Sequence, residues 1–259
     1  MSADAPHPVV LVPGACLGGW VYAEVARRLR ALGHDAYPVT LTGLGDRVHL
    51  ARPDTDLETH ITDVVNLLEH EDLHDAVLVG HSYSGIVVTG VADRRPQRLN
   101  AVVYLDCAPV PDGMALDGLM PAEIRERQRR DVDERGDGWR WPVPDRDTLT
   151  SGLYGSTAGL GEEHLRMVEE RGSPQPYATF TTPLRLNAAR PSGVRRVAIF
   201  GSDGGMSLET LRRLTEEGDP RAALFTGEDW ELHELPTGHW LMLSMPGEVA
   251  GLLHRIASG

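Results

Sequence analysis

The chain has 259 residues, of which 41% are hydrophobic and 24% charged, and its formal net charge at pH 7 is −13. This length suits one α/β domain with a large core and an inserted segment, and the acidic balance argues against nucleic acid and anionic membrane surfaces as partners. Two cysteines are too few for a disulfide framework. We expect a cytoplasmic protein, because we find neither a signal peptide nor the roughly 20 successive apolar residues that span a membrane.

Short apolar stretches alternate along the chain with longer stretches of helical periodicity. In one helical stretch, Val21, Val25, Leu29 and Leu32 recur at helical spacing, and another spans 57–68. Strands separated by helices predict a mostly parallel sheet with helices on both faces and binding residues at the carboxyl ends of the strands. The expected strands are 9–12, 36–41, 76–79, 101–105, 197–200 and 230–235.

The stretch 109–191 breaks this alternation and is predicted to form a lid inserted into the sheet domain. It contains a charge-rich helical stretch at 123–135, a tryptophan- and proline-rich stretch at 139–144 and a second helical stretch at 162–171. The lid is too short and too poor in core residues to favour an independent second domain. We therefore expect a single domain whose α/β core comprises 1–108 and 192–259.

The most informative stretch is 76–87, where an apolar strand runs into a tight turn and a helix follows. Ser82 lies in this turn, in a pattern close to G-x-S-x-G that has Ser84 at its last position and Gly85 one residue later. The pattern is typical of a nucleophile elbow, a strained turn that holds the serine hydroxyl above the sheet. Ser82 is the predicted nucleophile.

A serine hydroxyl needs a base to accept its proton, and His239 is the best placed of the eleven histidines. It comes just after the last expected strand, and the preceding Gly238 lets the loop turn the imidazole toward the nucleophile. We expect the neighbouring His81 to point away from Ser82 and to pack, and His60 to have no partner. The histidines show no metal-ligand spacing.

Two aspartates compete for the third position of a catalytic triad, the group that orients the imidazole. Asp203 follows the penultimate strand beside two glycines, a place that also suits an ordinary turn. Asp106 ends an apolar strand, where an unpaired carboxylate is costly. We favour Asp106 slightly, and Asp203 remains the alternative.

An oxyanion that develops during acyl transfer needs positioned hydrogen-bond donors. The backbone amide of Tyr83, directly after the nucleophile, is one candidate. The other is the amide of Ala15, in the glycine-rich loop after the first strand, where glycines let the backbone approach a substrate. That loop lacks both G-x-G-x-x-G and a P-loop lysine, so we do not expect it to bind phosphate.

Several stretches match one group of enzymes: 14–20 (GACLGGW), 40–47 (TLTGLGDR), 80–83 (GHSY), 103–106 (VYLD), 174–180 (PQPYATF) and 237–239 (TGH). They resemble the α/β-hydrolase group that contains plant methyl salicylate esterases, hydroxynitrile lyases and bacterial pyrethroid- or salicylate-esterase-like proteins. The resemblance implies the α/β-hydrolase fold and a cofactor-free serine esterase with Ser82 and His239 in the roles above. Plant members carry the acid where Asp203 stands, whereas bacterial members match this chain at Asp106.

The chain departs from the hydroxynitrile lyases of this group at two positions. Trp240 stands where their lysine is expected and Gly14 where their threonine is expected, so we do not expect hydroxynitrile lyase activity. We expect lid and loop residues to form an aromatic, apolar pocket for the acyl or alcohol group. The predicted pocket residues are Gly14, Cys16, Trp139, Trp141, Tyr154, Phe180 and Trp240, beside Tyr83.

The sequence thus predicts a carboxylic-ester hydrolase that acts on a small aromatic or apolar ester through an acyl-enzyme. Its partners would be small-molecule substrates rather than nucleic acid or membrane, no metal or cofactor is expected, and we allow for a homodimer. One alternative keeps the fold but performs lyase, cyclase or decarboxylase chemistry on a natural-product intermediate. Another is a ligand receptor on a hydrolase scaffold, although such receptors tend to lose a triad member and this chain has all three.

Overall fold

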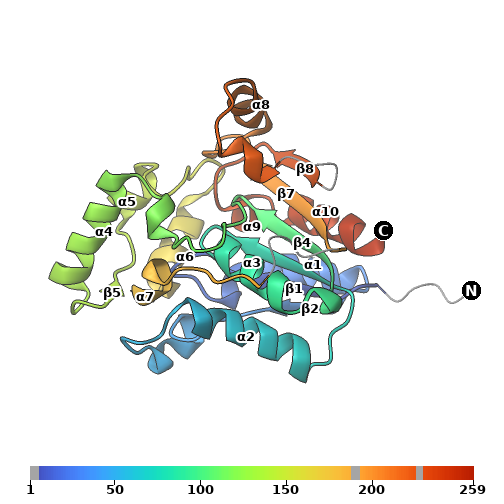
Figure 1. The fold of residues 1–259 in the computed structure, drawn as a ribbon, viewed down its shortest axis with the longest axis horizontal. Coiled ribbons are helices and arrows are strands. Elements are labelled where there is room, and N and C mark those ends of the chain that lie inside the picture. The colour runs from blue at the N-terminus through green and yellow to red at the C-terminus, as the bar shows by residue number, and fades with distance from the viewer. Residues whose placement is uncertain (1–5, 188–192, 226–229) are drawn as a thin grey trace, which may run out of the picture.

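The computed structural model describes residues 6–187, 193–225 and 230–259. Within them, parallel strands form one sheet in the order β2-β1-β3-β4-β7-β8 (Figure 1). The order reverses between β1 and β3, and such a switch point opens a crevice at the carboxyl ends of the strands. The strands are β1 (Val9–Val12), β2 (Ala36–Pro38), β3 (Ala76–His81), β4 (Leu99–Leu105), β7 (Arg195–Gly201) and β8 (Trp230–Leu235).

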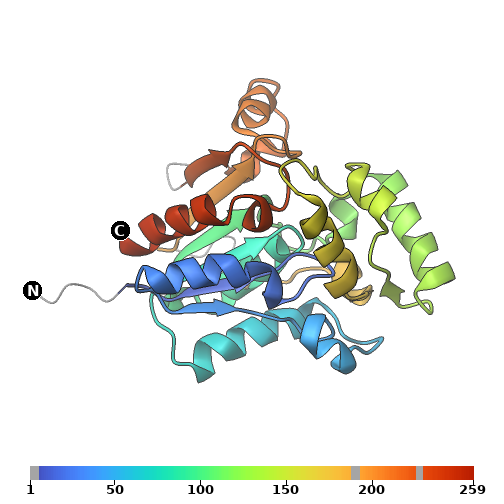
Figure 2. The same cartoon turned by 180° about the vertical axis from the view of Figure 1, so that it is seen from behind.

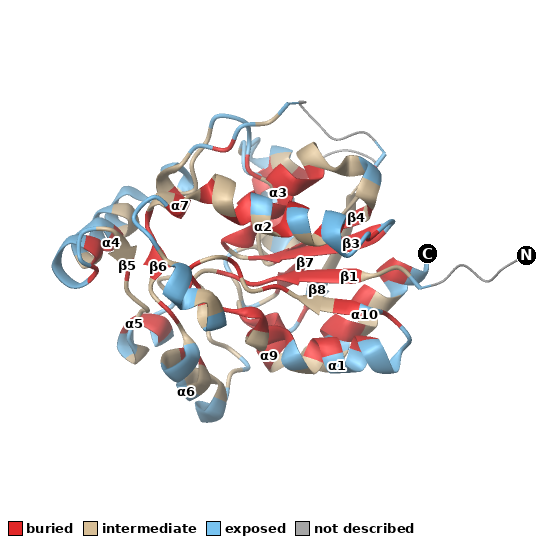
Figure 3. Ribbon diagram, turned by 90° about the horizontal axis from the view of Figure 1, so that it is seen from below, coloured by how far each residue is buried: buried red, intermediate tan, exposed pale blue. Residues whose placement is uncertain are grey.

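Helices cover both faces of this sheet. Figure 3 shows α2 and α3 on one face and α1, α9 and α10 on the other, and Figure 2 shows α1 and α10 side by side. The helices outside the inserted stretch are α1 (Ala23–Ala31), α2 (Leu57–His70), α3 (Ser84–Arg94), α8 (Leu208–Glu216), α9 (Leu241–Ser244) and α10 (Pro246–Ser258). Short 3-10 helices span Gly19–Tyr22, Gly45–Leu50, Pro96–Arg98, Asp117–Leu119 and Ala222–Phe225.

The central strands are apolar along their whole length because both of their faces are covered. In β1, Val10 and Val12 belong to the core under α2 and α3, whereas Val9 and Leu11 belong to the core under α1 and α10. This alternation follows from the two-residue period of a strand. The strand expected at 36–41 ends earlier, at Pro38.

Residues 109–187, which we call the cap, lie beyond the carboxyl ends of the strands, at the left of Figure 1. The cap contains α4 (Ala122–Arg135), β5 (Arg140–Trp141), α5 (Arg146–Thr150), α6 (Glu162–Arg171), β6 (Gln175–Pro176) and α7 (Ala178–Thr181), and β5 pairs antiparallel with β6. Its buried residues join the two cores of the sheet layer, with Trp141 and Phe180 in one and Leu149 and Val168 in the other. The expected lid boundary at 191–192 lies outside the described residues.

No helix among the described residues is long and apolar enough to cross a membrane.

Candidate active site

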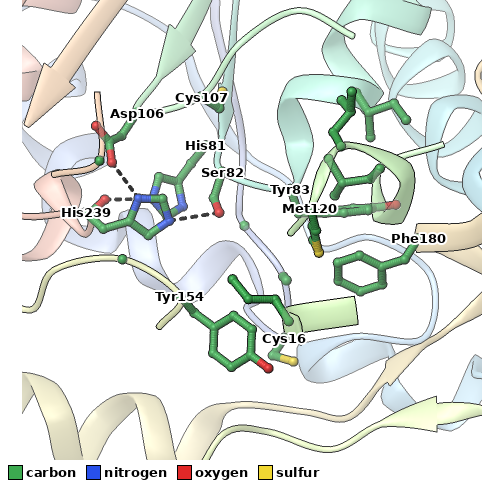
Figure 4. A pocket seen from close by; sticks show the side chains of 18 of the residues that line it. Cys16, His81, Ser82, Tyr83, Asp106, Cys107, Met120, Tyr154, Phe180 and His239 are labelled. Carbon is green, nitrogen blue, oxygen red and sulfur yellow. Dashed lines mark hydrogen bonds and ion pairs between the residues drawn. The ribbon is translucent and has the colours of Figure 1, made fainter. Parts of the chain in front are cut away.

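Ser82, His239 and Asp106 form a hydrogen-bonded row at the carboxyl ends of β3, β8 and β4 (Figure 4). His239 Nε2 lies 2.8 Å from Ser82 Oγ, and His239 Nδ1 lies 2.5 Å from Asp106 Oδ2. The imidazole therefore stands between a hydroxyl and a carboxylate, in the order that a Ser-His-Asp triad requires.

The backbone at Ser82 has the conformation of a strained turn. Its φ is 51°, in the left-handed region that non-glycine residues seldom adopt. A Cβ at Gly80 would meet the Ser84 carbonyl oxygen at 2.7 Å, and one at Gly85 would meet the Ala108 carbonyl oxygen at 2.7 Å. Small residues are therefore required on both sides of the turn.

Ser84, which departs from the usual glycine of this motif, is fully buried. Its Oγ donates a hydrogen bond of 2.5 Å to the carbonyl oxygen of Pro13. The departure thus connects the nucleophile turn to the loop after β1, the same loop that contains Ala15.

Asp106 is held on both of its oxygens. Oδ1 accepts a hydrogen bond from the Gly201 amide at 3.0 Å, and Oδ2 faces His239 Nδ1. Asp203, the alternative acid, is exposed, and its amide donates to the Thr237 carbonyl oxygen at 3.1 Å. The structure brings Asp106 and not Asp203 to the imidazole.

The cap holds the loop that contains His239. The His239 amide donates to the Ser156 carbonyl oxygen at 2.8 Å, and the Gly238 amide to the Ala158 carbonyl oxygen at 3.0 Å. A Cβ at Gly238 would lie 2.2 Å from the Ser156 oxygen, and one at Gly155 would lie 2.6 Å from His239 Cβ. The two glycines allow the cap and the histidine loop to approach this closely.

Two further histidines support the site: His81 packs as expected, whereas the expectation that His60 has no partner was wrong. The ring centroids of His81 and His239 are 4.6 Å apart, and His81 Nε2 donates to the His239 carbonyl oxygen at 2.8 Å. His60 has two partners, accepting from the Tyr83 hydroxyl at 2.8 Å and donating to the Thr42 carbonyl oxygen at 2.9 Å.

Both of these supporting histidines are buried in the core of the site. Burial lowers the pKa of His60, and burial together with the charge of His239 lowers the pKa of His81 well below its ordinary value. Each ring is therefore neutral, and each donates from the nitrogen that faces a carbonyl oxygen.

Ala15 and Tyr83 both line the cavity beside Ser82. In the loop after β1, the Cys16 amide donates to Gln175 Oε1 at 2.8 Å and the Leu17 amide to the Gly14 carbonyl oxygen at 3.3 Å. Among the described residues, the Ala15 and Tyr83 amides have no such partner, which is consistent with the expectation that they bind a substrate oxygen.

A cavity of about 460 Å³ opens in front of Ser82. Of the predicted pocket residues, the structure places Gly14, Cys16, Trp141, Tyr154, Phe180 and Trp240 in its lining. Trp139 is not part of the lining; its ring lies under the Arg140 guanidinium, 4.9 Å from the centroid, so this prediction was wrong. Burial raises the pKa of the Cys16 thiol to about 12, which makes it an apolar wall rather than a nucleophile.

Several lining residues were not foreseen. The cap residues among them include Leu116, Leu119, Met120, Ile124 and Gln128. Met206 and Phe225 come from the connection between β7 and β8. Ile124 and Gln128 lie on α4, on one helix face with Val132, and the many charged residues between them make this short stripe inconspicuous in the sequence. Among the described residues, no group of His, Cys, Asp and Glu side chains is arranged to hold a metal ion.

Comparisons with known proteins identify the family of this chain. The model of the alpha/beta hydrolase family matches residues 9–252. A carbendazim-hydrolysing esterase of Nocardioides sp. (strain SG-4G) is 34% identical over 249 residues, which cover 93% of this chain and 96% of the relative.

Two solved structures share the fold over nearly their whole length. An extracellular α/β-hydrolase from a Paenibacillus species, described as a structural and functional homologue of tobacco salicylic acid binding protein 2, has a TM-score of 0.79 at 19% identity, covering 97% of this chain and 99% of that one. A pyrethroid hydrolase from Sphingobium faniae JZ-2 has a TM-score of 0.71 at 21% identity, covering 98% of each chain. The match to the family model over most of the sequence, together with the sheet order, establishes that this chain belongs to the alpha/beta hydrolase family.

Proposed function

We propose that this chain is a carboxylic-ester hydrolase in which Ser82 is the nucleophile, His239 the general base and Asp106 the acid that orients it. The observation that carries the proposal is the row of two hydrogen bonds, 2.8 Å from Ser82 to His239 and 2.5 Å from His239 to Asp106. The Nocardioides relative, described as an esterase that hydrolyses carbendazim, supports ester hydrolysis as the reaction class.

The reaction follows from the positions of these groups. Ser82 Oγ attacks the ester carbonyl carbon while its proton passes to His239 Nε2, and Asp106 stabilises the resulting imidazolium. The carbonyl oxygen, now negative, accepts hydrogen bonds from the amides of Ala15 and Tyr83. The tetrahedral intermediate collapses as the C–O bond to the alcohol breaks, and the leaving alcohol takes the proton from His239.

Hydrolysis of the acyl-enzyme repeats these steps with water. A water molecule attacks the acyl carbon and gives a proton to His239, and the Ser82–acyl bond breaks as Ser82 takes that proton back. The product is a carboxylic acid, and the free enzyme is restored.

The cavity supports a small aromatic or apolar ester as the substrate. Trp141 packs edge-to-face against both Tyr154 and Phe180, with centroid distances of 5.0 and 5.5 Å, so the aromatic wall has a fixed shape. A flat acyl or alcohol group fits against such a wall better than a polar or flexible one.

The direct test is the Ser82→Ala variant assayed with p-nitrophenyl acetate and p-nitrophenyl butyrate. We expect turnover to fall by about 10⁴-fold or more while the far-UV circular dichroism spectrum is unchanged. Wild-type protein should also take up one fluorophosphonate label, at Ser82 by peptide mass. Unchanged turnover in the variant would contradict the proposal. Labelling of Ser82 with no turnover across a panel of activated esters would instead favour lyase, cyclase or decarboxylase chemistry.

Three expectations from the sequence stay predictions. Limited proteolysis tests the division into a core and a lid. Cell fractionation tests the cytoplasmic location, and light scattering tests the homodimer.

A further inference from the structure

Three side chains of the cavity lining have a buried polar atom without a hydrogen-bond partner among the described residues: Gln128, Tyr154 and His81. The His81 atom is Nδ1, which lies against Gly14, where a Cβ would be 2.7 Å from it, and His81 Nε2 bonds the His239 carbonyl oxygen. The other two atoms have no such setting. Gln128 of α4 is only 1% exposed, and its Oε1 atom has no hydrogen-bond partner in the described part of the chain. The hydroxyl oxygen of Tyr154 is also buried and lacks a partner among the described residues. Buried polar atoms nearly always find a partner, so these two point to a group supplied by whatever occupies the cavity.

The cap holds both side chains in place. Arg127, next to Gln128, donates from Nη2 to Thr148 Oγ1 at 2.8 Å and thereby joins α4 to α5, which lie side by side in Figure 1. Tyr154 follows α5, and its ring is fixed edge-to-face on Trp141 at 5.0 Å. Figure 4 shows the Tyr154 ring below Ser82 and His239, with its hydroxyl near Cys16.

The charges around the cavity restrict what kind of group can bind there. Of the described lining residues, only Asp106 is an acidic side chain, and it already bonds His239 and Gly201; the lining contains neither lysine nor arginine. A charged ligand would therefore lie in this apolar space without a counter-charge. A neutral ligand is favoured.

We propose that Gln128 and Tyr154 form a polar subsite that binds one neutral hydrogen-bond-donating group of the substrate, a hydroxyl or an N–H, away from the ester. A carboxamide oxygen only accepts hydrogen bonds, so the partner of Gln128 must donate, and the Tyr154 hydroxyl can accept or donate. The inference rests on the proposed function and narrows its substrates to aromatic or apolar esters that carry one such group. Esters that are wholly hydrocarbon apart from the ester group leave Gln128 unbonded and are disfavoured.

The test compares esters that differ only in a hydroxyl and a methyl group of similar size. The first pair varies the acyl group: the p-nitrophenyl esters of 3-(4-hydroxyphenyl)propanoic acid and 3-(4-methylphenyl)propanoic acid. The second pair varies the alcohol: the acetates of the corresponding 2-arylethanols. The 3-substituted isomers of both pairs are included. In wild-type protein we expect kcat/KM to favour the hydroxyl ester by about tenfold or more in at least one pair.

Gln128→Leu, which keeps the volume but removes the acceptor, should reduce that ratio to about one and raise kcat/KM for the methyl ester. Glu126→Leu, at an exposed position of the same helix, is the matched control and should keep the wild-type ratio. The ratio cancels any loss of activity common to both esters. No preference for the hydroxyl in any pair, or a preference that survives in Gln128→Leu, would overturn the inference.

Failure of the proposed function is separable from failure of the subsite. If no ester is turned over, titration calorimetry of Ser82→Ala and Ser82→Ala/Gln128→Leu with methyl 3-(4-hydroxyphenyl)propanoate and its 4-methyl analogue still tests the subsite. Tighter binding of the hydroxyl compound by about tenfold, lost with Gln128, supports it. Equal binding of the two compounds refutes it.

Discussion

Replacing Asp106 by asparagine should disable the enzyme without unfolding it, and the hydrogen bonds around this residue say why. Asp106 Oδ1 accepts from the Gly201 amide at 3.0 Å, and Oδ2 accepts from His239 Nδ1 at 2.5 Å. An asparagine has one acceptor oxygen and one NH2 group, so it satisfies only one of these two donors. If the oxygen stays with Gly201, the NH2 group faces His239 and donates to Nδ1, which moves the imidazole proton to Nε2.

A proton on Nε2 removes the acceptor that Ser82 needs. In the opposite orientation the NH2 group would face the Gly201 amide, a donor against a donor, which leaves a buried group unbonded at a cost of about 1–3 kcal/mol. The first orientation is therefore favoured, and we expect kcat to fall by about 10⁴-fold, equivalent to about 5.4 kcal/mol in the activation free energy.

The assay is steady-state hydrolysis of p-nitrophenyl acetate by Asp106→Asn, with Asp203→Asn as the matched control. Asp203 is exposed and lies outside the cavity lining, so its variant should stay within about twofold of wild type. Thermal unfolding of both variants checks that the fold is intact. A loss of less than tenfold in Asp106→Asn, or a loss of similar size in Asp203→Asn, would refute the tautomer argument.

Three more predictions concern the surroundings of the triad. Gly155→Ala should lower the unfolding free energy by about 2 kcal/mol or more and also lower kcat, because φ of Gly155 is +118° and a Cβ there would lie 2.6 Å from His239 Cβ. Gly152 has φ +79° and open space around it, so Gly152→Ala should show only the smaller backbone cost. Chemical denaturation and steady-state kinetics of the two variants measure the difference. Gln175→Ala removes the acceptor for the Cys16 amide, so kcat should fall about tenfold, and Gln97→Ala serves as an exposed control. Unchanged kcat in Gln175→Ala would show that the loop does not need this bond. The pKa values of His60 and His81 are lowered from 6.5, so the unfolded state binds more protons and stability should fall as pH drops below 6.5, by up to about 1.4 kcal/mol per pH unit for each histidine. Urea titrations between pH 5 and 7 measure that slope, which should be about one proton smaller in His60→Phe.

The pairing of Ser82 with His239 could be predicted because the signals of both residues are local. Ser82 lies between an apolar strand and a helix among small residues, and its φ of 51° is what such a turn requires. His239 follows the last strand after a glycine that the fold needs, since a Cβ there would lie 2.2 Å from the Ser156 oxygen. Both signals come from a few neighbouring residues.

The acid and the pocket could not be predicted in the same way, because they depend on contacts between distant parts of the chain. Asp106 and Asp203 follow adjacent parallel strands, β4 and β7, so periodicity alone does not say which carboxylate faces the imidazole. Trp139 and Trp141 are two residues apart, yet only Trp141 lines the cavity. Gln128 lies between Ile124 and Val132 on one face of a charge-rich helix, and only its burial against the cavity distinguishes it from the other polar residues of that helix.

The cap does more than cover the candidate active site. Its Ser156 and Ala158 carbonyl oxygens accept hydrogen bonds from the amides of His239 and Gly238, so this part of the cap, together with Asp106 and His81, holds His239 in place. The part formed by α4 makes no such bond to the histidine loop, and it contributes Gln128 to the cavity. Substrate entry that moves α4 while residues 155–158 stay fixed would leave the triad intact. The same cap would then combine a fixed half that serves the chemistry with a half that recognises the substrate.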